Sequence, residues 1–379
     1  MTTRTRLSGC LLAVAAACHR APPTATAPAH ADATPTAVAH EPPASTDPDA
    51  RARGQEVYDQ AYALAMEGDF TAALPLFRRA TEIDPTLAVA WFDLAGLSEQ
   101  LGDADAARVA MERCVAVEPA FIQARVELAT LYDDDLDAAM TQLRRALTEP
   151  TPFVIDRYTA AHTRGEGLHK VAVTYARLDF PAATASIERS LFADPMADID
   201  PRADRIARRA QDELDGAMVA DPARAAAIAA LVRDANAAVT RPAAEAALRR
   251  HQALAASLED GAAIDRWQVW RQLARLELAA EQPVAADASL IRAAEAAKRL
   301  PLERWLDTTN DRIAVEVRLG RLDAAARAFD ELAWLEYVTA NADAPVGGRT
   351  RSRRVGTAPE LAPLRGRADY QRTVAALGL

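Results

Sequence analysis

The chain repeats itself with a period of 34 residues. Gly68-Asp69 follows one apolar helical segment, and Gly102-Asp103 follows another segment 34 positions later. Asp84-Pro85 and Glu118-Pro119 close the segments that come next and are also 34 residues apart. A fixed period of this length indicates a stack of similar helical hairpins, because no single hairpin can bury its apolar face alone. The period therefore predicts an all-α fold.

Small residues recur where the helices of each hairpin would cross. In the second copy Ala95 and Ala107 occupy these positions, and Met111 fills the space beside the crossing. Glycine permits the turn between the helices, and proline ends the second helix. The residues expected to pack the repeats are Gly68, Ala73, Phe77, Ala80, Pro85, Trp91, Leu94, Ala95, Gly102, Ala107, Met111, Cys114 and Pro119.

This pattern resembles the tetratricopeptide repeat. Three copies cover about residues 54–150, and weaker ones cover about 165–195 and 267–335. The resemblance implies a solenoid, or superhelix, of helix-turn-helix units in which the first helix of each pair lines a concave groove. The closing segment, 359–371, resembles the short end-of-array segment of many bacterial tetratricopeptide proteins, which implies that it caps the last apolar face.

The N-terminus is typical of an export signal. Residues 1–6 are short and positive, residues 7–17 are apolar and small, and Cys18 follows directly. The segment resembles a bacterial lipoprotein signal, which implies cleavage before Cys18 and acylation of its thiol. Simple secretion and no export are the alternatives. Residues 19–50 are rich in Ala, Pro and Thr and cannot bury a core, so they predict a disordered tether.

These features divide the chain into six parts. They are a signal peptide (1–17), a Pro/Ala-rich tether (18–50), an array of three repeats (51–150), degenerate helical repeats or a helical spacer (151–262), further tetratricopeptide-like repeats (263–335), and a Gly/Arg loop with a C-terminal capping helix (336–379). The fourth part predicts helices at about 202–218, 222–238 and 241–258 that cannot be phased with the repeat. The loop, 341–357, carries Arg349, Arg351, Arg353 and Arg354, which either contact an anionic partner or are simply solvated.

No signature of an enzyme, a metal site or a cofactor is present. His162, Glu166 and His169 have the spacing of ligands on one helix, but Gly165 and Gly167 interrupt that helix, so we expect a surface linker. Only Cys114 would remain after processing at Cys18, so no internal disulfide is expected and Cys114 is interpreted as a buried, inert thiol. The net charge of -10 disfavours nucleic acid as a partner.

The candidate binding residues lie at equivalent positions of three successive first helices. Acidic residues stand 34 apart, apolar or aromatic residues precede them, and one further tyrosine faces the same way: Tyr58, Asp59, Tyr62, Phe92, Asp93, Val126 and Glu127. The alternative is that the acids only keep the surface soluble. We therefore expect a non-enzymatic scaffold in the cell envelope (periplasm or outer membrane) that contacts the membrane through its lipid anchor only. It would bind a protein or peptide with basic and apolar residues, as an assembly factor would. The alternative is a secreted carbohydrate- or peptide-processing enzyme with its site in residues 200–262.

Overall fold

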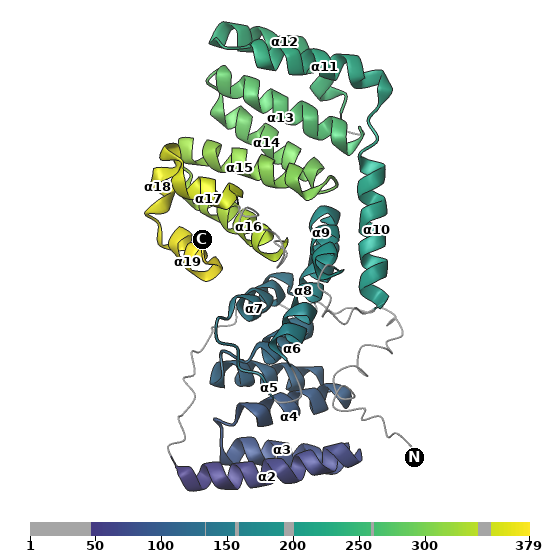
Figure 1. Cartoon of the computed structure of the whole chain (residues 1–379), viewed down its shortest axis with the longest axis vertical. Helices are drawn as coiled ribbons and strands as arrows, with labels where there is room; N and C mark the ends of the chain where they lie inside the picture. The colour runs from purple at the N-terminus through teal and green to yellow at the C-terminus, as the bar shows by residue number, and fades with distance from the viewer. Residues whose placement is uncertain (1–46, 133, 156–158, 193–200, 259–260, 340–349) are drawn as a thin grey trace, which may run out of the picture. The chain divides into compact units, whose positions relative to one another are not determined.

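The computed structural model describes residues 47–132, 134–155, 159–192, 201–258, 261–339 and 350–379 (Figure 1). Every regular element in these ranges is a helix, so the predicted all-α class, built from helical hairpins, is confirmed. The predicted signal peptide, Cys18 and the tether as far as residue 46 lie outside the described residues. Helix α2 begins at Pro48, so positions 48–50 are helical and are not part of a tether.

The chain forms two compact units, residues 1–167 and residues 168–379, which are called unit 1 and unit 2 below. The division falls inside helix α8 (Ala160–Arg177). Throughout the described ranges, each helix is too short or too polar to cross a lipid bilayer.

Unit 1 contains three hairpins in chain order. The pairs are α2 (Pro48–Glu67) with α3 (Phe70–Ile83), α4 (Ala88–Gln100) with α5 (Ala104–Val117), and α6 (Ile122–Leu131) with α7 (Leu136–Thr148). Each helix packs on the next one along the chain, both within the hairpins and between them. The three hairpins correspond to the three repeats predicted over residues 51–150.

The repeated Gly-Asp pair explains where the second helices begin. The side chains of Asp69, Asp103 and Asp135 each accept a hydrogen bond from the backbone N–H three residues later, at 2.9–3.1 Å. An aspartate in this position satisfies one of the free N–H groups at a helix start. Gly68 and Gly102 have φ of 87° and 86°, which a side chain would strain. The residues that recur every 34 positions therefore include those that form the turns and cap the helices, as well as those that pack the core.

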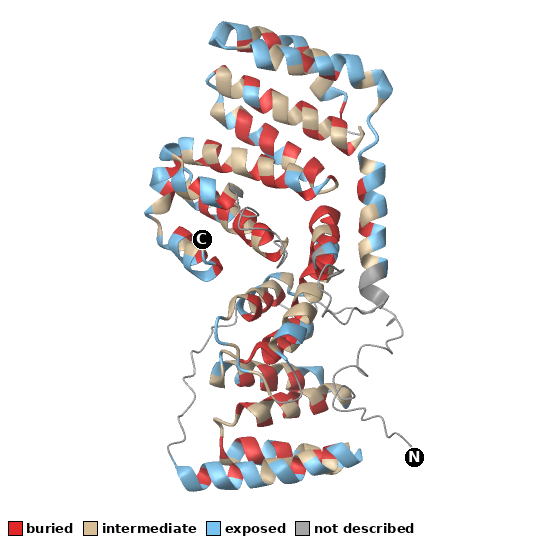
Figure 2. Ribbon diagram, viewed as in Figure 1, coloured by how far each residue is buried: buried red, intermediate tan, exposed pale blue. Residues whose placement is uncertain are grey.

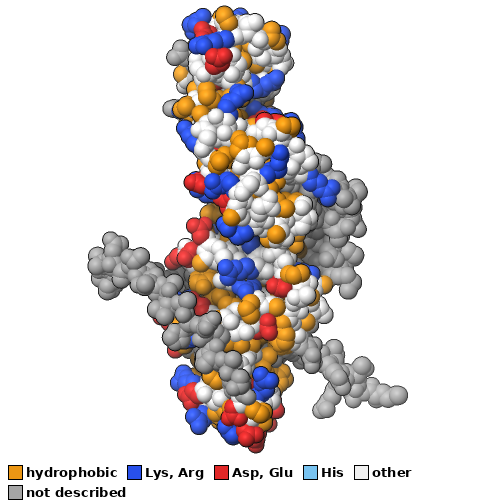
Figure 3. Space-filling model, turned by 90° about the vertical axis from the view of Figure 1, so that its left-hand side faces the viewer, with side chains coloured by type: hydrophobic (Ala, Val, Ile, Leu, Met, Phe, Trp, Pro, Cys, Tyr) orange, Lys and Arg blue, Asp and Glu red, His pale blue; other side chains and the backbone are white. Residues whose placement is uncertain are grey.

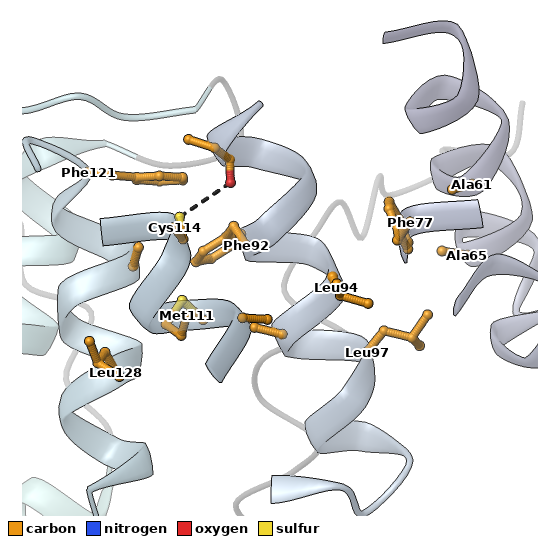
Figure 4. Close-up of a cluster of buried hydrophobic side chains, with 14 of the residues drawn as sticks. Ala61, Ala65, Phe77, Phe92, Leu94, Leu97, Met111, Cys114, Phe121 and Leu128 are labelled. Carbon is orange, nitrogen blue, oxygen red and sulfur yellow. Dashed lines mark hydrogen bonds between the residues drawn. The ribbon is translucent and has the colours of Figure 1, made fainter. Parts of the chain in front are cut away.

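Small residues do lie at the crossings of unit 1. Ala73, Ala80, Ala107 and Cys114 are all 0% exposed. Phe77 and Met111 fill the space beside them in the same hydrophobic cluster (Figure 4). Figure 2 shows buried residues along the sides where these helices face one another, with exposed residues on the outer sides. The repeat pattern therefore predicted the burial of these small residues.

Unit 2 contains the remaining helices. After the end of α8 they are α9 (Pro181–Phe192), α10 (Pro201–Ala217), α11 (Pro222–Ala237), α12 (Arg241–Ala256), α13 (Ala263–Ala279), α14 (Pro283–Ala297), α15 (Leu302–Arg318), α16 (Leu322–Thr339), α17 (Thr350–Thr357), the 3-10 turn η2 (Pro359–Leu361), α18 (Ala362–Arg365) and α19 (Ala368–Leu377). The three unphased helices predicted before residue 260 are confirmed as α10, α11 and α12.

Packing in unit 2 departs from chain order at α9. Helix α9 packs on α10, but also on α15 and α16, while α11 and α12 pack on α13 (Figure 1). The Tyr175 hydroxyl donates to Glu331 Oε1 at 2.9 Å, and the rings of Phe180 and Trp305 are 5.3 Å apart. Helices α10–α14 therefore form an insertion in the sequence between two helical pairs that pack together, α8 with α9 and α15 with α16. The sequence analysis left open whether residues 151–262 are degenerate repeats or a helical spacer, and both alternatives remain predictions.

Two sequence interpretations are wrong. Helix α8 runs continuously through Gly165 and Gly167, so His169 lies on a helix and not in a linker. Its Nδ1 lies 2.9 Å from Glu188 Oε1 on α9, and the described residues contain no group of side chains suited to a metal. The second half of the predicted Arg loop is helix α17, because the buried carboxylate of Glu336 accepts the N–H groups of Arg351 and Ser352 at its start.

The C-terminal segment packs on the last long helix. Helices α17, α18 and α19 all contact α16. Tyr370 stacks on the buried ring of Phe329 with centroids 4.5 Å apart, and Thr373 donates a hydrogen bond to Asp330. The apolar side of α16 is therefore covered by the chain's own end.

Candidate functional site

The predicted acidic residues of unit 1 lie on the first helix of each hairpin. Asp59 is on α2, Asp93 on α4 and Glu127 on α6. The Tyr58 hydroxyl donates to Asp93 Oδ2 at 2.8 Å, and this bond joins two successive hairpins across the same face. Asp59 is exposed and accepts a hydrogen bond from Gln55, while Asp93 and Glu127 are half-buried. The structure thus brings Tyr58, and not Asp59, into contact with Asp93.

Two tyrosines flank the acids on α2. Tyr58 and Tyr62 are half-buried, and their rings stack with centroids 6.0 Å apart. Tyr58 also contacts the core ring of Phe77, at 5.8 Å. The two tyrosines are thus fixed from behind while part of each remains at the surface. An aromatic ring held in this way can contact an apolar or cationic side chain at little cost in conformational entropy.

The other two apolar residues of the predicted face belong to the core. Phe92 is 7% exposed, and its ring lies 5.0 Å from that of Phe121. Val126 is 1% exposed, and a methyl group added at Gly167 would lie 3.3 Å from it, so α8 covers it. The prediction placed both at the surface because their positions in the repeat match Tyr58. Phe121, within the array, packs on Phe92, and α8, which follows the array, covers Val126.

An aromatic segment after α7 was missed by the sequence analysis. The Phe153 N–H donates to the carbonyl of Ala120 at 2.8 Å, and its ring meets Phe121 edge-on at 4.9 Å. Phe153 is 37% exposed, and Ile155 packs against the core of unit 1. The apolar run 153–155, placed just after Pro150, was the available signal. The segment extends the row of rings formed by Phe92 and Phe121.

A hydrogen bond recurs at equivalent positions in two repeats. Trp91 Nε1 donates to the carbonyl of Pro85 at 2.9 Å, and Arg125 Nε donates to the carbonyl of Pro119 at 2.7 Å. Arg125 stands 34 residues after Trp91, as Pro119 does after Pro85. Burial lowers the pKa of Arg125, and its Nη1 also donates to Gln142. Arginine was not identified from the pattern because it replaces an aromatic residue.

Cys114 is enclosed in the second hairpin. Its Sγ donates to the carbonyl of Ala88 at 3.3 Å (Figure 4). Burial raises the pKa of this thiol well above its ordinary value, and the nearby carboxylates of Asp93 and Glu118 add to the effect. The thiolate is the reactive form of cysteine, so the site favours an inert thiol, as predicted.

The basic residues near the C-terminus divide into structural and exposed groups. Arg351 pairs with Asp307 at 2.7 Å and with the buried Glu336 at 3.6 Å. Arg353 and Arg354 are exposed, and Arg349 lies outside the described residues. On the face drawn in Figure 3, basic and acidic side chains are interspersed among apolar ones. One member of the predicted basic cluster therefore fixes the fold of α17.

A cavity lies in unit 2. A cavity of about 350 Å³ opens between α12 and α13, with Trp270 and Leu273 on one side and Leu248 on the other. Two carboxylates, Glu245 and Glu277, also line it. The sequence gave no reason to connect these residues, because they come from helices outside the regular repeats.

Comparison with known proteins identifies the repeat. A family model described as tetratricopeptide repeat matches residues 64–125, from the end of α2 to the start of α6. The matched range contains Asp93 but neither Asp59 nor Glu127. No curated protein sequence matches the chain. Helical-hairpin arrays of this kind commonly present extended surfaces to other proteins.

Several solved structures are similar to the chain. PilW, described as a widely conserved type IV pilus biogenesis factor, is 13% identical over 82% of this chain and 97% of that one, with a TM-score of 0.28. The TPR domain of P58(IPK) is 14% identical over 83% of this chain and 100% of that one, with a TM-score of 0.25. Yeast Tom70 is 12% identical over 86% and 70%, with a TM-score of 0.26.

Proposed function

We propose that unit 1 is a scaffold module that binds a protein or peptide segment carrying Lys or Arg beside apolar side chains. One observation carries the proposal. The bond between Tyr58 and Asp93 joins neighbouring hairpins, which supports placing residues 34 apart in the sequence on the same side of the array. Glu127 stands 34 residues after Asp93 on α6, and Asp59 stands 34 residues before it on α2. Together these positions form an acidic row next to two tyrosine rings.

The chemistry of this row favours a cationic partner. Each exposed ion pair contributes only about 0.2–1 kcal/mol, so no single acid determines affinity. Three acids in a row raise the local concentration of a basic segment and fix its position, and salt weakens both effects. Tyr58 and Tyr62 supply surface for apolar side chains and for cation–π contact. The proposed partner is therefore bound weakly at each position and selected by the whole row.

The proposed setting is the cell envelope. If Cys18 is acylated, the tether that follows it places the folded units at a membrane surface without a spanning helix. One acyl chain anchors only marginally, so stable attachment requires the two or three chains of a mature lipoprotein. The full chain is expected in the membrane fraction, and Cys18→Ser in the soluble fraction. Equal partitioning of both would exclude this anchor.

Charge reversal of the row tests the binding proposal. The variant is Asp59→Lys with Asp93→Lys and Glu127→Lys. A matched control reverses three exposed acids on the second helices, Glu82→Lys, Asp105→Lys and Asp137→Lys, and changes the net charge equally. Binding to a synthetic peptide array that varies Lys, Arg and apolar residues is measured by fluorescence anisotropy at low and high salt.

We expect the wild type and the control to bind basic-apolar peptides more weakly as salt rises, and the row variant to lose this binding. Far-ultraviolet circular dichroism checks that all three proteins keep their helices. Equal binding by the row variant and the control would show that the acids serve solubility and that the binding face lies elsewhere.

The enzyme alternative has one structural counterpart, the cavity between α12 and α13. It takes Glu245 from the range 200–262, but Trp270 and Glu277 lie outside that range. The described residues that line it include no Ser, Thr, Cys or His. Its wall does hold two carboxylates, Glu245 and Glu277, the group that glycoside hydrolases use, so an assay of glycoside hydrolysis with Glu277→Gln as the control tests the enzyme alternative. We interpret it as a place for a ligand.

A further inference from the structure

The cavity of unit 2 combines an apolar wall with a carboxylate that has one oxygen without a hydrogen-bond donor among the described residues. Its volume of about 350 Å³ is at the lower end of the range for small-molecule sites, about 300–1,000 Å³. Leu248 and Ala255 on α12 face Trp270 and Leu273 on α13 across it. These side chains offer contact to a short hydrocarbon stem. The cavity belongs to unit 2 and does not depend on the acidic row of unit 1.

Glu277 is the polar group that distinguishes this cavity. It is half-buried on α13, and burial raises the pKa of its carboxyl above the ordinary value of 4.5. Ser289 supplies one hydrogen bond to the carboxyl. The other oxygen, Oε2, is buried and receives no hydrogen bond from the described residues. A buried oxygen without a donor is costly to the free protein and gains most from a ligand that provides one.

The neighbouring charges leave this oxygen unsatisfied. The Arg292 guanidinium lies 4.5 Å from the centre of the Trp270 ring, and its charge lowers the pKa of Glu277, but by less than burial raises it. Glu245, on the opposite side, accepts a hydrogen bond from Arg241 Nε at 3.0 Å. Glu245 is therefore engaged in an ion pair, whereas Glu277 Oε2 is buried without a donor among the described residues.

We propose that this cavity binds a primary ammonium group on a short apolar stem, with the Glu277 carboxylate turning toward the cavity to accept from the ammonium and the stem lying against Leu248 and Leu273. An ammonium supplies both the missing hydrogen bond and a compensating charge, which a hydroxyl or amide does not. A carboxylate or phosphate ligand would meet two carboxylates against the single guanidinium of Arg249 in the wall. The ammonium belongs either to a free alkylamine or to a lysine side chain of a peptide.

Three ligands of equal length separate the contributions. Hexylamine, hexan-1-ol and hexanoate are titrated into the purified full chain by calorimetry. Hexylamine is expected to bind at least about tenfold more tightly than the alcohol, because a hydrogen bond to a charged group is worth about 1.5–3 kcal/mol and 1.4 kcal/mol is tenfold. Hexanoate is expected not to bind. Equal binding of the amine and the alcohol, or no binding of the amine, overturns the proposal.

A pair of variants tests the residue. Glu277→Gln keeps the shape and removes the charge, and is expected to weaken hexylamine binding about tenfold or more. Glu295→Gln on α14 is the matched control, because Glu295 is exposed and pairs only with the nearby Lys298 among the contacts seen. It should bind as the wild type does. Unchanged binding in Glu277→Gln, with circular dichroism intact, overturns the assignment.

A further ligand identifies the source of the ammonium. An acetylated and amidated peptide with one lysine between apolar residues is compared with the same peptide carrying norleucine. Tighter binding of the lysine peptide than of hexylamine assigns the cavity to a protein segment, and the reverse assigns it to a free amine. The row variant of unit 1 should bind hexylamine normally, so failure of one proposal can be told from failure of the other.

Discussion

Unit 1 and unit 2 hold their helices together by different means. In unit 1 each helix packs on its neighbour in the chain, and the crossings are made by small residues such as Ala73 and Ala107. In unit 2 helix α9 meets α15 and α16 across more than 100 residues of sequence, and buried polar contacts accompany the packing. Glu336 accepts three hydrogen bonds from Arg351 and Ser352 in addition to its ion pair.

The difference follows from how many partners each helix could choose. In a stack built in chain order, the next hairpin is always nearest, so apolar shape is enough to specify contact. A chain that leaves and returns must select one surface among several similar ones. A buried polar group penalises every arrangement that leaves it unpaired. In unit 2 the Trp267 indole donates to Thr308, and Asp287 pairs with Arg312 and Arg321.

The largest expected effect is therefore in unit 2. Glu336→Ala removes the carboxylate that begins α17 and leaves Arg351 without its buried partner. We expect the free energy of unfolding of unit 2 to fall by about 3–5 kcal/mol, because breaking a buried pair from one side is strongly destabilising. Urea unfolding followed by circular dichroism measures it. Glu303→Ala, an exposed site on α15, is the control and should change stability by no more than about 0.5 kcal/mol.

The stability of unit 1 should instead depend most on the size of the side chains where two helices cross. Ala107→Leu forces a larger side chain between α4 and α5 and should cost about 1–3 kcal/mol. The matched change Ala116→Leu lies on the exposed side of the same helix and should cost little. Thermal unfolding compares the two. If both variants melt at the same temperature, the crossing is not where the repeat phase puts it.

The sequence predicted more of unit 1 than of unit 2, because only unit 1 is packed in chain order. The Gly-Asp and Asp-Pro pairs fix turns and caps locally, so three hairpins and their buried positions could be placed in unit 1. The partners of α9 could not, since nothing local to Phe180 or Tyr175 points to Trp305 or Glu331. The helix α17 was missed because its start is stabilised by Glu336, which lies before the intervening segment.

The candidate sites show the same limit. The acidic row was predicted because its members recur with the repeat, and it remains a proposal. Phe92 and Val126 were placed at the surface by the same reasoning, but Phe121 and α8 bury them. Glu277 and Trp270 were not connected with Leu248 because the cavity depends on how α12 meets α13. A repeat period predicts contacts within its own array but gives no information on the contacts of helices outside it.

A smaller effect tests whether the equivalent hydrogen bonds of Trp91 and Arg125 contribute equally to the stability of unit 1. Trp91→Phe removes the bond to the Pro85 carbonyl and keeps the aromatic ring, so it should cost about 0.5–1.5 kcal/mol. Arg125→Met removes the corresponding bond to Pro119, together with the bond to Gln142, and keeps an unbranched apolar stem. Urea midpoints of both variants should fall in the same direction. A stable Arg125→Met variant would mean that the hydrogen bond recurs without contributing to stability.

The smallest effect has the opposite sign and concerns the unpartnered carboxylate of unit 2. Because the pKa of Glu277 is raised in the folded protein, the folded state holds its proton to a higher pH than the unfolded state does. Its contribution to stability is therefore most favourable at acidic pH and declines as pH rises through the folded pKa.

Glu277→Gln removes the cost of the buried charge and should raise the stability of unit 2 at pH 7 by up to about 1 kcal/mol. The gain over the wild type should shrink as pH falls toward the ordinary carboxyl value of 4.5. Urea unfolding at several pH values measures it. A variant that is less stable than the wild type at pH 7 would place Glu277 with the partnered carboxylates, such as Glu336, and would remove the energetic reason for a ligand to bind there.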